Sequence, residues 1–558
     1  MPDILFMPEN IKVDILPGDT ILEAARKVNL IIESPCDGNG TCGKCKVRVS
    51  QGLENGVSLL DDSDELSPEE IERGYVLACQ AAVTDDVTVE TVSTAGQNKT
   101  LKILSEGQSF SYDIINFITK KYGNGETTVY AGGIPVGTEA GDTSGMNYGL
   151  AIDIGTTTLV CAMIDALTGR ELTSVSALNP QSLHAQDVLT RIKFASKAEG
   201  LKIMYEGICA ELRNMIAELC QETGIESGYI YEAVYSGNTT MIHLAANVDP
   251  VSLGKYPYTP RIRGGNHIPA REHGLNISPF GLIYLPPIIS TYVGPDITSG
   301  VLAARLHERK GTTLFIDIGT NGEMVIARDG SMSATSTAAG PAFEGMNITC
   351  GMRAGRGAIE YFNIAEDGSL DIRTIGNEKA VGICGSGLFD IVGELVRTQV
   401  INANGKIVPP EKGQYMEPLK KRVLPLNGKY AFEIAEGVYI SQGDVRQVQL
   451  AKGAVRSGVE ALLKSENVKY EDVSSVLIAG SFGYHLRAES LVNIALLPKE
   501  FIDKIEFVGN TSKSGGEAFL LNRPCRREME HLVKNINCVE LSNQEGFDRL
   551  FVSCLGFK

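Results

Sequence analysis

Residues 149–160 read GLAIDIGTTTLV, and residues 313–324 read TLFIDIGTNGEM. Each stretch is an apolar run followed by Asp-Ile-Gly-Thr and a return run, which predicts a strand, a tight turn and a second strand. The two aspartates, Asp153 and Asp317, lie a domain's length apart. This spacing predicts two related halves rather than a short repeat. From residue 147 onward, strand and helix patterns alternate, which is typical of an α/β fold.

The repeated turn has the chemistry of a phosphate-binding loop. Its glycine lets the backbone approach an anion, and the polar side chains that follow can donate hydrogen bonds. The aspartate can hold Mg²⁺ directly or through water, because this ion prefers oxygen ligands. Two such turns facing each other could hold the β,γ-phosphate pair of a nucleotide from both sides. The GxxxxGK[ST] motif of a P-loop is missing from the sequence. The candidates are Asp153, Gly155, Thr156 and Thr157 in the first copy, and Asp317, Gly319, Thr320 and Asn321 in the second.

Two further segments carry candidate residues for this site. In PPIISTYVGPDITSG, Asp296 follows an apolar run and begins a predicted helix, so it is a candidate second Mg²⁺ or water-positioning carboxylate. In AAGPAFEG, Glu344 follows the turn at Gly340. ATP hydrolysis needs a group that orients the attacking water, and Glu344 and Asp153 are the candidates. Glu344 is equally well explained as a surface or helix-cap carboxylate.

A second kind of site is indicated near the start of the chain, where PCDGNGTCGKC (35–45) is followed by LACQ (77–80). Four such cysteines could bind zinc, form disulfides or hold an iron–sulfur cluster. Structural zinc sites usually use two close pairs of ligands, and disulfides are disfavoured in a reducing cytoplasm. Three thiolates on a glycine-rich loop with a distant fourth are typical of [2Fe–2S] ferredoxins. The predicted ligands are Cys36, Cys42, Cys45 and Cys79; a degenerate cysteine loop is the alternative.

Residues 1–95 read as one small α+β unit around this cysteine loop. A helix is predicted to begin at Thr20, which forms a T-x-x-E capping box with Glu23. Two strands before this helix, one after the loop and a late fourth strand suit the β-grasp fold. The unit holds 7 Lys and Arg against 18 Asp and Glu, so it carries most of the net charge of −17. The strands are predicted at 4–7, 11–16, 46–50 and 87–92.

Residues 96–146 are predicted to be a linker, because they are rich in glycine and polar residues. Within it we expect a short helix near 111–121 and a strand near 127–131. The rest of the chain is predicted to divide into lobes at roughly 147–310 and 311–558.

The composition excludes several classes of protein. The chain has 558 residues, of which 43% are hydrophobic and 21% charged, as is ordinary for a folded domain protein. Its net charge of −17 argues against bulk nucleic-acid binding. Runs of about 18 apolar residues and the features of a signal peptide are both missing from the sequence. We therefore expect a cytoplasmic protein that binds neither nucleic acid nor membrane.

The two Asp-Ile-Gly-Thr turns resemble the phosphate-1 and phosphate-2 motifs of the actin, Hsp70 and sugar-kinase ATPase superfamily. This resemblance implies an actin-like ATPase domain over 147–558, with two RNase H-like lobes and ATP between them. The adenosine motif of that superfamily matches VLIAGSFG (476–483). The implied adenosine-binding residues are Gly480, Ser481 and Phe482.

A ferredoxin ahead of an actin-like ATPase resembles the reductive activators of corrinoid-dependent methyltransferases and corrinoid iron–sulfur proteins. The resemblance covers nearly the whole chain, because GPAFEGM, GICGSGLFDI and QLAKGA also match. It implies that ATP use drives reduction of inactive Co(II) corrinoid to Co(I), with the [2Fe–2S] cluster as electron relay. The implied partners are a corrinoid protein and an upstream low-potential electron donor. Related ATPase domains often dimerise, which leaves a homodimer open.

Two alternatives remain at the level of sequence. The chain could be an ATP-driven activator of another low-potential enzyme, although such activators usually share a [4Fe–4S] cluster. It could also be a non-catalytic ATP-binding redox sensor. A test that adds ATP and a Co(II) corrinoid protein separates these readings.

Overall fold

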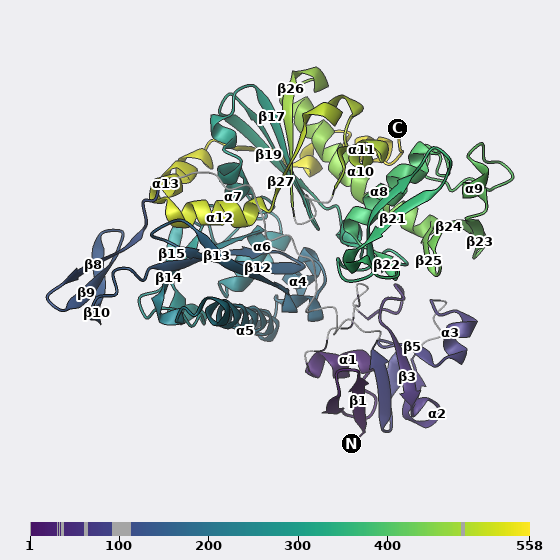
Figure 1. The fold of residues 1–558 in the computed structure, drawn as a ribbon, viewed down its shortest axis with the longest axis horizontal. Helices are drawn as coiled ribbons and strands as arrows, with labels where there is room; N and C mark the ends of the chain where they lie inside the picture. Colours follow the sequence, from purple (N-terminus) through teal and green to yellow (C-terminus); the bar gives the residue numbers. More distant parts are fainter. Residues whose placement is uncertain are drawn as a thin grey trace. The chain divides into compact units, whose positions relative to one another are not determined.

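The computed structural model describes residues 2–28, 30, 32, 34, 38–60, 65–91, 113–480 and 486–558, and the statements below concern these residues. They form two compact units, drawn as ribbons in Figure 1. The first unit comprises Met1–Lys102 and Pro180–Phe194, and the second comprises Ile103–Asn179 and Ala195–Lys558.

The first unit is built on a five-stranded sheet with the strand order β2-β1-β7-β3-β5. Strands β1 and β7 pair in parallel, and the other neighbours are antiparallel. Helix α1 (Ile21–Lys27) begins with the predicted Thr20–Glu23 capping box. The β-grasp prediction is therefore confirmed. The strands are β1 Asp3–Met7, β2 Ile11–Asp14, β3 Lys46–Gln51, β4 Val57–Leu59, β5 Tyr75–Leu77, β6 Ala81–Val83 and β7 Val87–Thr91, and the other helices of this unit are α2 Leu53–Gly56, α3 Pro68–Glu72 and α4 Val188–Phe194.

The second unit contains two six-stranded sheets that share one core topology. The first has the order β13-β12-β11-β14-β16-β15, and the second has the order β28-β19-β18-β17-β26-β27. In each sheet three consecutive antiparallel strands are followed by two parallel ones. These are the two expected RNase H-like lobes. The strands are β11 Tyr148–Ile154, β12 Thr158–Asp165, β13 Glu171–Leu178, β14 Ile230–Gly237, β15 Asn266–Pro269 and β16 Leu282–Leu285 in the first lobe, and β17 Thr312–Ile318, β18 Gly322–Arg328, β19 Ser331–Thr337, β26 Val473–Ala479, β27 Ile505–Gly509 and β28 Asn537–Cys538 in the second.

One helix of the C-terminal part packs on the first lobe. Helix α12 (Thr511–Leu521) follows β27 of the second lobe, but it contacts β11 and β14 of the first lobe and the helix α7 (Pro295–Ala303). Figure 1 shows α12 lying along the first lobe. The two helices approach so closely that a Cβ at Gly515 would lie 2.0 Å from the carbonyl oxygen of Ser299. Glycine is therefore required at this crossing.

Part of the predicted linker is a small sheet in the second unit. Strands β8 (Ile118–Gly123), β9 (Glu126–Ala131) and β10 (Ile134–Ala140) pair as an antiparallel meander. The strand near 127–131 is confirmed. The helix near 111–121 is wrong where the structure describes it, because β8 begins at Ile118. The Lys120 ammonium connects this sheet to the first lobe, because it donates a 2.6 Å hydrogen bond to the hydroxyl of Tyr231. Such a contact between distant residues cannot be predicted from a local sequence pattern.

Further elements surround the second lobe. Helix α10 (Gln442–Ser465) packs on strands β18 and β19 of the second lobe. Two three-stranded sheets have the orders β21-β20-β22 and β23-β24-β25. The remaining elements of the second unit are α5 Ala198–Thr223, α6 Thr239–Ala245, β20 Ala358–Ile364, β21 Leu370–Thr374, β22 Gly382–Ile383, α8 Gly385–Arg397, α9 Glu417–Lys420, β23 Val423–Leu426, β24 Lys429–Ala435, β25 Val438–Ser441, α11 Ala488–Asn493, α13 Arg523–Leu532 and α14 Phe547–Ser553, besides short 3₁₀ turns.

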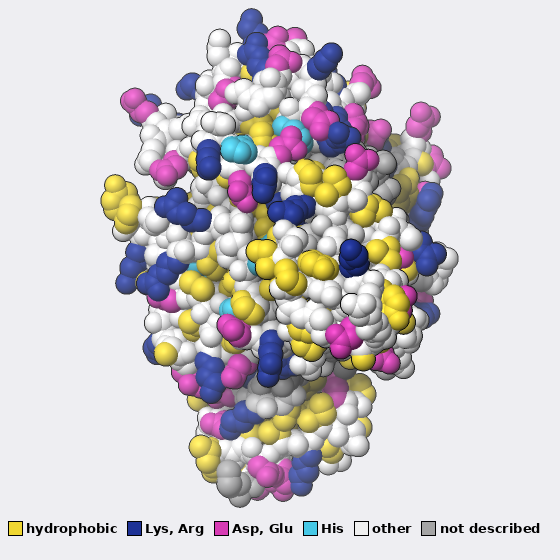
Figure 2. Space-filling view, turned by 90° about the vertical axis from the view of Figure 1, so that its left-hand side faces the viewer, with side chains coloured by type: hydrophobic (Ala, Val, Ile, Leu, Met, Phe, Trp, Pro, Cys, Tyr) yellow, Lys and Arg dark blue, Asp and Glu magenta, His cyan; other side chains and the backbone are white. Residues whose placement is uncertain are grey.

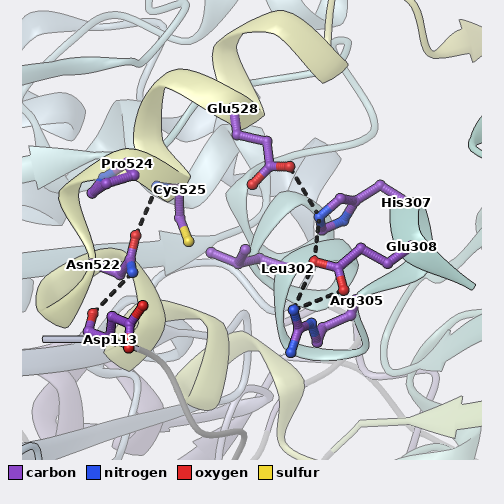
Figure 3. A pocket seen from close by; sticks show the side chains of 9 residues that line it. All are labelled: Asp113, Leu302, Arg305, His307, Glu308, Asn522, Pro524, Cys525 and Glu528. Atoms are coloured by element: carbon purple, nitrogen blue, oxygen red, sulfur yellow. Dashed lines mark hydrogen bonds and ion pairs between the residues drawn. The ribbon is translucent and has the colours of Figure 1, made fainter.

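The surface shown in Figure 2 carries acidic and basic side chains interspersed with small hydrophobic groups. A pocket of about 300 Å³ lies beside α7 and α13 (Figure 3). In it the Nε2 atom of His307 lies 3.3 Å from the carboxylate of Glu528 and 3.4 Å from that of Glu308. This pocket is lined by none of the residues predicted to bind nucleotide. No helix in the described part of the chain is long and apolar enough to cross a membrane.

Candidate functional site

The cysteine loop brings together two of the four predicted ligands. Cys45 and Cys79 are buried with their sulfur atoms 3.2 Å apart, and Cys42 is half-buried. Cys36 lies outside the described residues. The Cys45 thiol hydrogen-bonds to Cys79 and lowers the pKa of the Cys79 thiol to about 6. Two thiols this close suit joint ligation of one metal ion.

Glycines shape the backbone around these sulfurs. Gly38 and Gly40 have φ angles of 84° and 73°, a region that strongly favours glycine. A Cβ at Gly40 would lie 3.0 Å from the side chain of Gln80. The Gln80 amide donates a 2.8 Å hydrogen bond to the carbonyl of Gly38 and lies 3.6 Å from the sulfur of Cys79. This cradle of glycine backbone and sulfur fits an iron–sulfur cluster.

The two phosphate loops occupy equivalent places in the two lobes. Each lies between the first two antiparallel strands of its lobe, as the sequence predicts. The amide of Gly155 donates to the carbonyl of Thr158, and the amide of Gly319 donates to the carbonyl of Asn321, both at 3.0 Å. A Cβ at Gly155 would lie 2.6 Å from that Thr158 oxygen, so this turn requires glycine. The Thr156 hydroxyl accepts a 3.0 Å hydrogen bond from Asn238, a residue that the sequence analysis did not select.

Glu344 connects the two loops. Its carboxylate accepts one hydrogen bond from the Thr157 hydroxyl of the first loop and another from the Thr320 hydroxyl of the second loop. Both hydroxyls lie on the turns predicted to bind phosphate. The backbone amide of Gly340 also donates to the carbonyl of Thr320 at 2.9 Å, so the Gly340–Glu344 turn follows the second loop closely. Glu344 is half-buried, and its contacts favour a role at the phosphate loops over that of a surface or helix-cap carboxylate.

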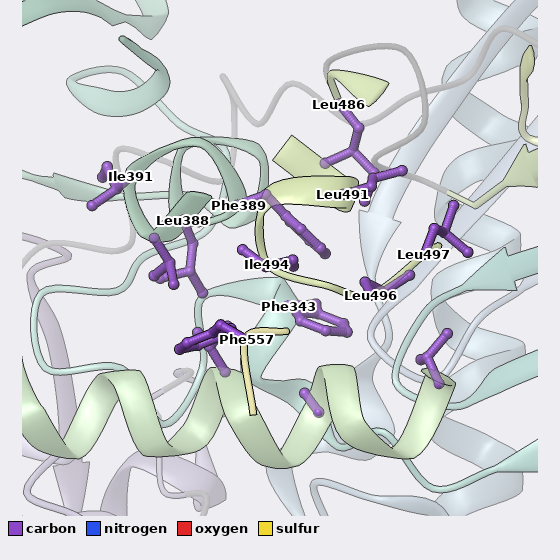
Figure 4. Packing of buried hydrophobic residues seen from close by; sticks show 14 of the residues in the cluster. Phe343, Leu388, Phe389, Ile391, Leu486, Leu491, Ile494, Leu496, Leu497 and Phe557 are labelled. Carbon is purple, nitrogen blue, oxygen red and sulfur yellow. The ribbon is translucent and has the colours of Figure 1, made fainter. Parts of the chain in front are cut away.

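The residues on either side fix Glu344 in place. Phe343 is 1% exposed, and its ring lies 4.5 Å from that of Phe389 between centroids. Figure 4 shows Phe343 inside the hydrophobic cluster of the second lobe. Gly345 has a φ of 77°, and a Cβ there would lie 2.5 Å from the carbonyl oxygen of Met352. The carboxylate therefore projects from a rigid turn.

Four carboxylates gather beside the loops: Asp153, Asp296, Asp317 and Glu323. The three aspartates keep partial contact with solvent although they lie deep in the unit. Burial, with repulsion from Asp153, raises the pKa of Asp296 to about 7. Burial, with repulsion from Asp296 and Asp153, raises the pKa of Asp317 to about 8, and Glu323 shifts in the same direction. Carboxylates that repel each other in this way fit a divalent cation and its phosphate ligand. As they stand, no three His, Cys, Asp or Glu side chains of the described residues are close enough to one another to hold a metal ion.

Asp153 has partners that the sequence analysis missed. The Asn510 amide donates to its Oδ2 atom at 2.9 Å, and the Ser512 hydroxyl donates to its Oδ1 atom at 2.8 Å. Burial raises the pKa of Asp153, and these two hydrogen bonds lower it. The available signal was the polar Asn-Thr-Ser run directly after an apolar strand, a common helix start. Glu323 was also missed, although a glutamate inside an apolar strand pattern is unusual.

Gly480 is the described part of the predicted adenosine motif. It has a φ of 113°, and a Cβ there would lie 2.4 Å from the carbonyl oxygen of Ile318 and 3.0 Å from Oδ1 of Asp317. Glycine therefore allows the end of β26 to approach the second phosphate loop. Ser481 and Phe482 lie outside the described residues.

His243 and the cysteines outside the ligand loop lie in the second unit. His243 is buried, and its ring nitrogens hydrogen-bond with the backbone of Thr239, Arg261 and Ile262, so it is a fully paired core residue. Four of the eight cysteines outside the loop are buried: Cys161, Cys209, Cys384 and Cys525. The other four are half-buried: Cys220, Cys350, Cys538 and Cys554.

Together these features define an actin-like ATPase joined to a ferredoxin-type domain. Family models match along the chain: the 2Fe-2S iron-sulfur cluster binding domain over residues 6–84, the RACo middle region over 148–309, and the C-terminal ASKHA domain of RACo over 311–558.

Similar proteins agree with these matches. A solved structure described as a reductive activator for corrinoid, iron-sulfur protein is 30% identical, with a TM-score of 0.73 over 100% of this chain and 98% of that one. The corrinoid activation enzyme RamQ of Eubacterium limosum is 29% identical over 93% of both chains. A [Co(II) methylated amine-specific corrinoid protein] reductase of Methanosarcina barkeri is 26% identical over 74% of this chain and 77% of its own length. The chain belongs to the RACo family of corrinoid reductive activators.

Proposed function

We propose that this protein uses ATP to reduce the inactive Co(II) form of a partner corrinoid protein to Co(I). The observation that carries this proposal is a cysteine cradle suited to an iron–sulfur cluster in the same chain as two phosphate loops that share one carboxylate. The relatives act on corrinoid proteins by name, and the full-length similarity supports the same substrate class here.

In this proposal Cys36, Cys42, Cys45 and Cys79 hold a [2Fe–2S] cluster. When bound, the cluster supplies one-electron transfer. It would relay one electron from an upstream low-potential donor to Co(II), which would become Co(I). The cysteine loop excludes water from the buried Cys45 and Cys79 sulfurs and supports them with backbone amides.

The ATPase residues have separate roles. The hydroxyls of Thr157 and Thr320 donate to the phosphates, and Asp153 with Asp317 would accommodate Mg²⁺. Glu344 orients the attacking water between the loops, because it already lies against a hydroxyl of each. A low-potential reduction can be driven only if the nucleotide states bind the partner differently. ATP therefore changes which corrinoid state the activator favours.

The decisive experiment mixes the reduced holoprotein with a Co(II) corrinoid protein and follows absorbance. The Co(I) band should form with MgATP and fail to form without nucleotide. An equal yield of Co(I) without ATP would contradict the ATP-driven mechanism. No Co(I) with any corrinoid protein tested would favour another low-potential target or a redox sensor.

A further inference from the structure

We propose that Asn510 and Ser512, at the start of helix α12, are positioning residues that hold the Asp153 carboxylate toward the first phosphate loop for ATP hydrolysis. This inference rests on the proposed ATPase function and adds two residues to it. Both side chains are buried, at 3% and 5% exposure. Each donates to a different oxygen of Asp153, at 2.9 and 2.8 Å.

Two donors on two oxygens fix the rotation of a carboxylate about its side-chain bonds. Asp153 needs such restraint, because Asp296 and Asp317 lie close enough to repel it. Without the donors, the carboxylate would turn away from these neighbours or rotate freely. A misplaced carboxylate would lower the rate of ATP hydrolysis, because catalysis of phosphoryl transfer depends on groups held in the right position beforehand.

The donors themselves are held rigidly. The Asn510 Oδ1 atom accepts a 2.9 Å hydrogen bond from the backbone amide of Lys513, so Asn510 caps α12 and faces Asp153 with its amide group. The Lys513 ammonium is 3% exposed and pairs with Glu171 of β13 at 2.6 Å. The start of α12 is therefore attached to the first lobe on both sides of Ser512.

Close helix packing fixes this assembly relative to Asp296. Gly515 of α12 lies against Ser299 of α7 with no room for a Cβ. Asp296 lies in the first turn of α7. The same pair of helices thus presents Asn510, Ser512 and Asp296 to the end of the strand that carries Asp153.

The test compares variants of the full-length holoprotein by steady-state ATP hydrolysis. Ser512→Ala removes one donor and keeps the helix cap. It should lower kcat about tenfold, the usual effect of losing a hydrogen bond to a charged group, with KM for ATP changed less than about twofold. Ser512→Thr keeps a hydroxyl donor and should restore most of kcat.

Ser514→Ala is the matched control. The Ser514 hydroxyl donates to the backbone carbonyl of Asn510 at 3.2 Å, in the same turn of α12. This variant should keep nearly the wild-type kcat. Equal kcat for Ser512→Ala and Ser514→Ala would overturn the inference, and so would a Ser512→Thr variant as slow as Ser512→Ala at unchanged Tm.

Asn510→Asp provides a second test that does not depend on Ser512. It keeps an acceptor for the Lys513 amide but replaces the donor that faces Asp153 with an oxygen. We expect kcat to fall at least as far as in Ser512→Ala, with Tm within a few degrees of wild type; an unchanged kcat would contradict the positioning role. A wild-type protein that hydrolyses no ATP would instead refute the proposed ATPase function.

Discussion

Thr157 and Thr320, which come from the two different lobes, donate their hydroxyl hydrogens to the same carboxylate, that of Glu344. The turn that carries this carboxylate is anchored by Phe343 in the core of the second lobe. A charged group shared by both phosphate loops has two consequences. The Glu344 carboxylate can orient a water molecule between the two loops. Its hydrogen bonds from Thr157 and Thr320 must break when these hydroxyls donate to phosphate oxygens instead.

Replacing Glu344 by Gln should therefore separate kcat from nucleotide binding. The amide cannot accept hydrogen bonds at both ends, and it cannot take a proton from water. We expect kcat for ATP hydrolysis to fall about 100-fold, the usual scale for losing a positioned base. ATP should bind at least as tightly as before, because one negative charge is removed near the phosphates. Calorimetry with ATP and steady-state kinetics check the two effects, and an unchanged kcat would refute the role of Glu344.

Asp317→Asn should reduce the pH dependence of stability in the nucleotide-free protein. The folded pKa of Asp317 is raised to about 8 from an ordinary value of 3.8. Its stabilising contribution is therefore complete below about pH 4 and is lost as the pH rises through about 8. Wild-type Tm should fall between pH 6 and 8.5, and Asp317→Asn should flatten this slope and add about 1 kcal/mol or more at pH 8.5.

Asp367→Asn is the control for this pH experiment. Asp367 is exposed, and its hydrogen bonds to Ser369 lower its pKa. This substitution should leave the slope of Tm against pH between 6 and 8.5 as it is in the wild type. If Asp317→Asn behaved in the same way, the raised pKa of Asp317 would be wrong.

Cys42→Ser should abolish the [2Fe–2S] cluster and the formation of Co(I) while leaving ATP binding intact. The ligand loop and the phosphate loops belong to different compact units, so loss of one site need not disturb the other. Visible absorption and iron content report the cluster, and calorimetry reports ATP. Cys220→Ser, at a half-buried position on α5, should keep both. Activation that persists in Cys42→Ser would refute the relay.

Gln80→Leu should make the cluster harder to reduce. The Gln80 amide lies 3.6 Å from the sulfur of Cys79, and N–H groups near ligand sulfurs stabilise the reduced cluster. A tenfold shift of the reduction equilibrium would lower the midpoint potential by about 59 mV. A redox titration followed by EPR measures it, with Gln51→Leu at the exposed end of β3 as control. An unchanged potential in Gln80→Leu would exclude a tuning role.

The sequence was sufficient for those parts of the site that lie within single loops. The repeated Asp-Ile-Gly-Thr turn predicted Asp153, Asp317 and the duplicated lobes, because a local pattern encodes a strand, a turn and a return strand. The contacts of Asp153 with Asn510 and Ser512 were out of reach, since these residues are 357 and 359 positions away from it. Only the packing of α12 on the first lobe brings them together.

The misread linker has a similar cause. The segment that forms β8 to β10 is rich in glycine, which is why its pattern indicated a mobile chain. Its stability comes instead from side-chain contacts within the small sheet and with Tyr231 of β14. The Lys120 ammonium pairs with Glu139 at 2.8 Å and with the Tyr231 hydroxyl at 2.6 Å, almost without contact with solvent. Local propensity does not report such tertiary contacts.

The crossing of α12 onto the first lobe also means that the two halves of the ATPase are not separable modules. A fragment that ends near residue 310 would keep β11 and β14 but lose the helix that covers them. The complementary fragment would expose Ala518, Phe519, Leu520 and Leu521, which are all buried in the intact chain. Co-expression of the two pieces would have to re-form this interface before Asp153 regained its partners. ATP hydrolysis by a split version of the protein would thus report whether the two pieces had reassembled.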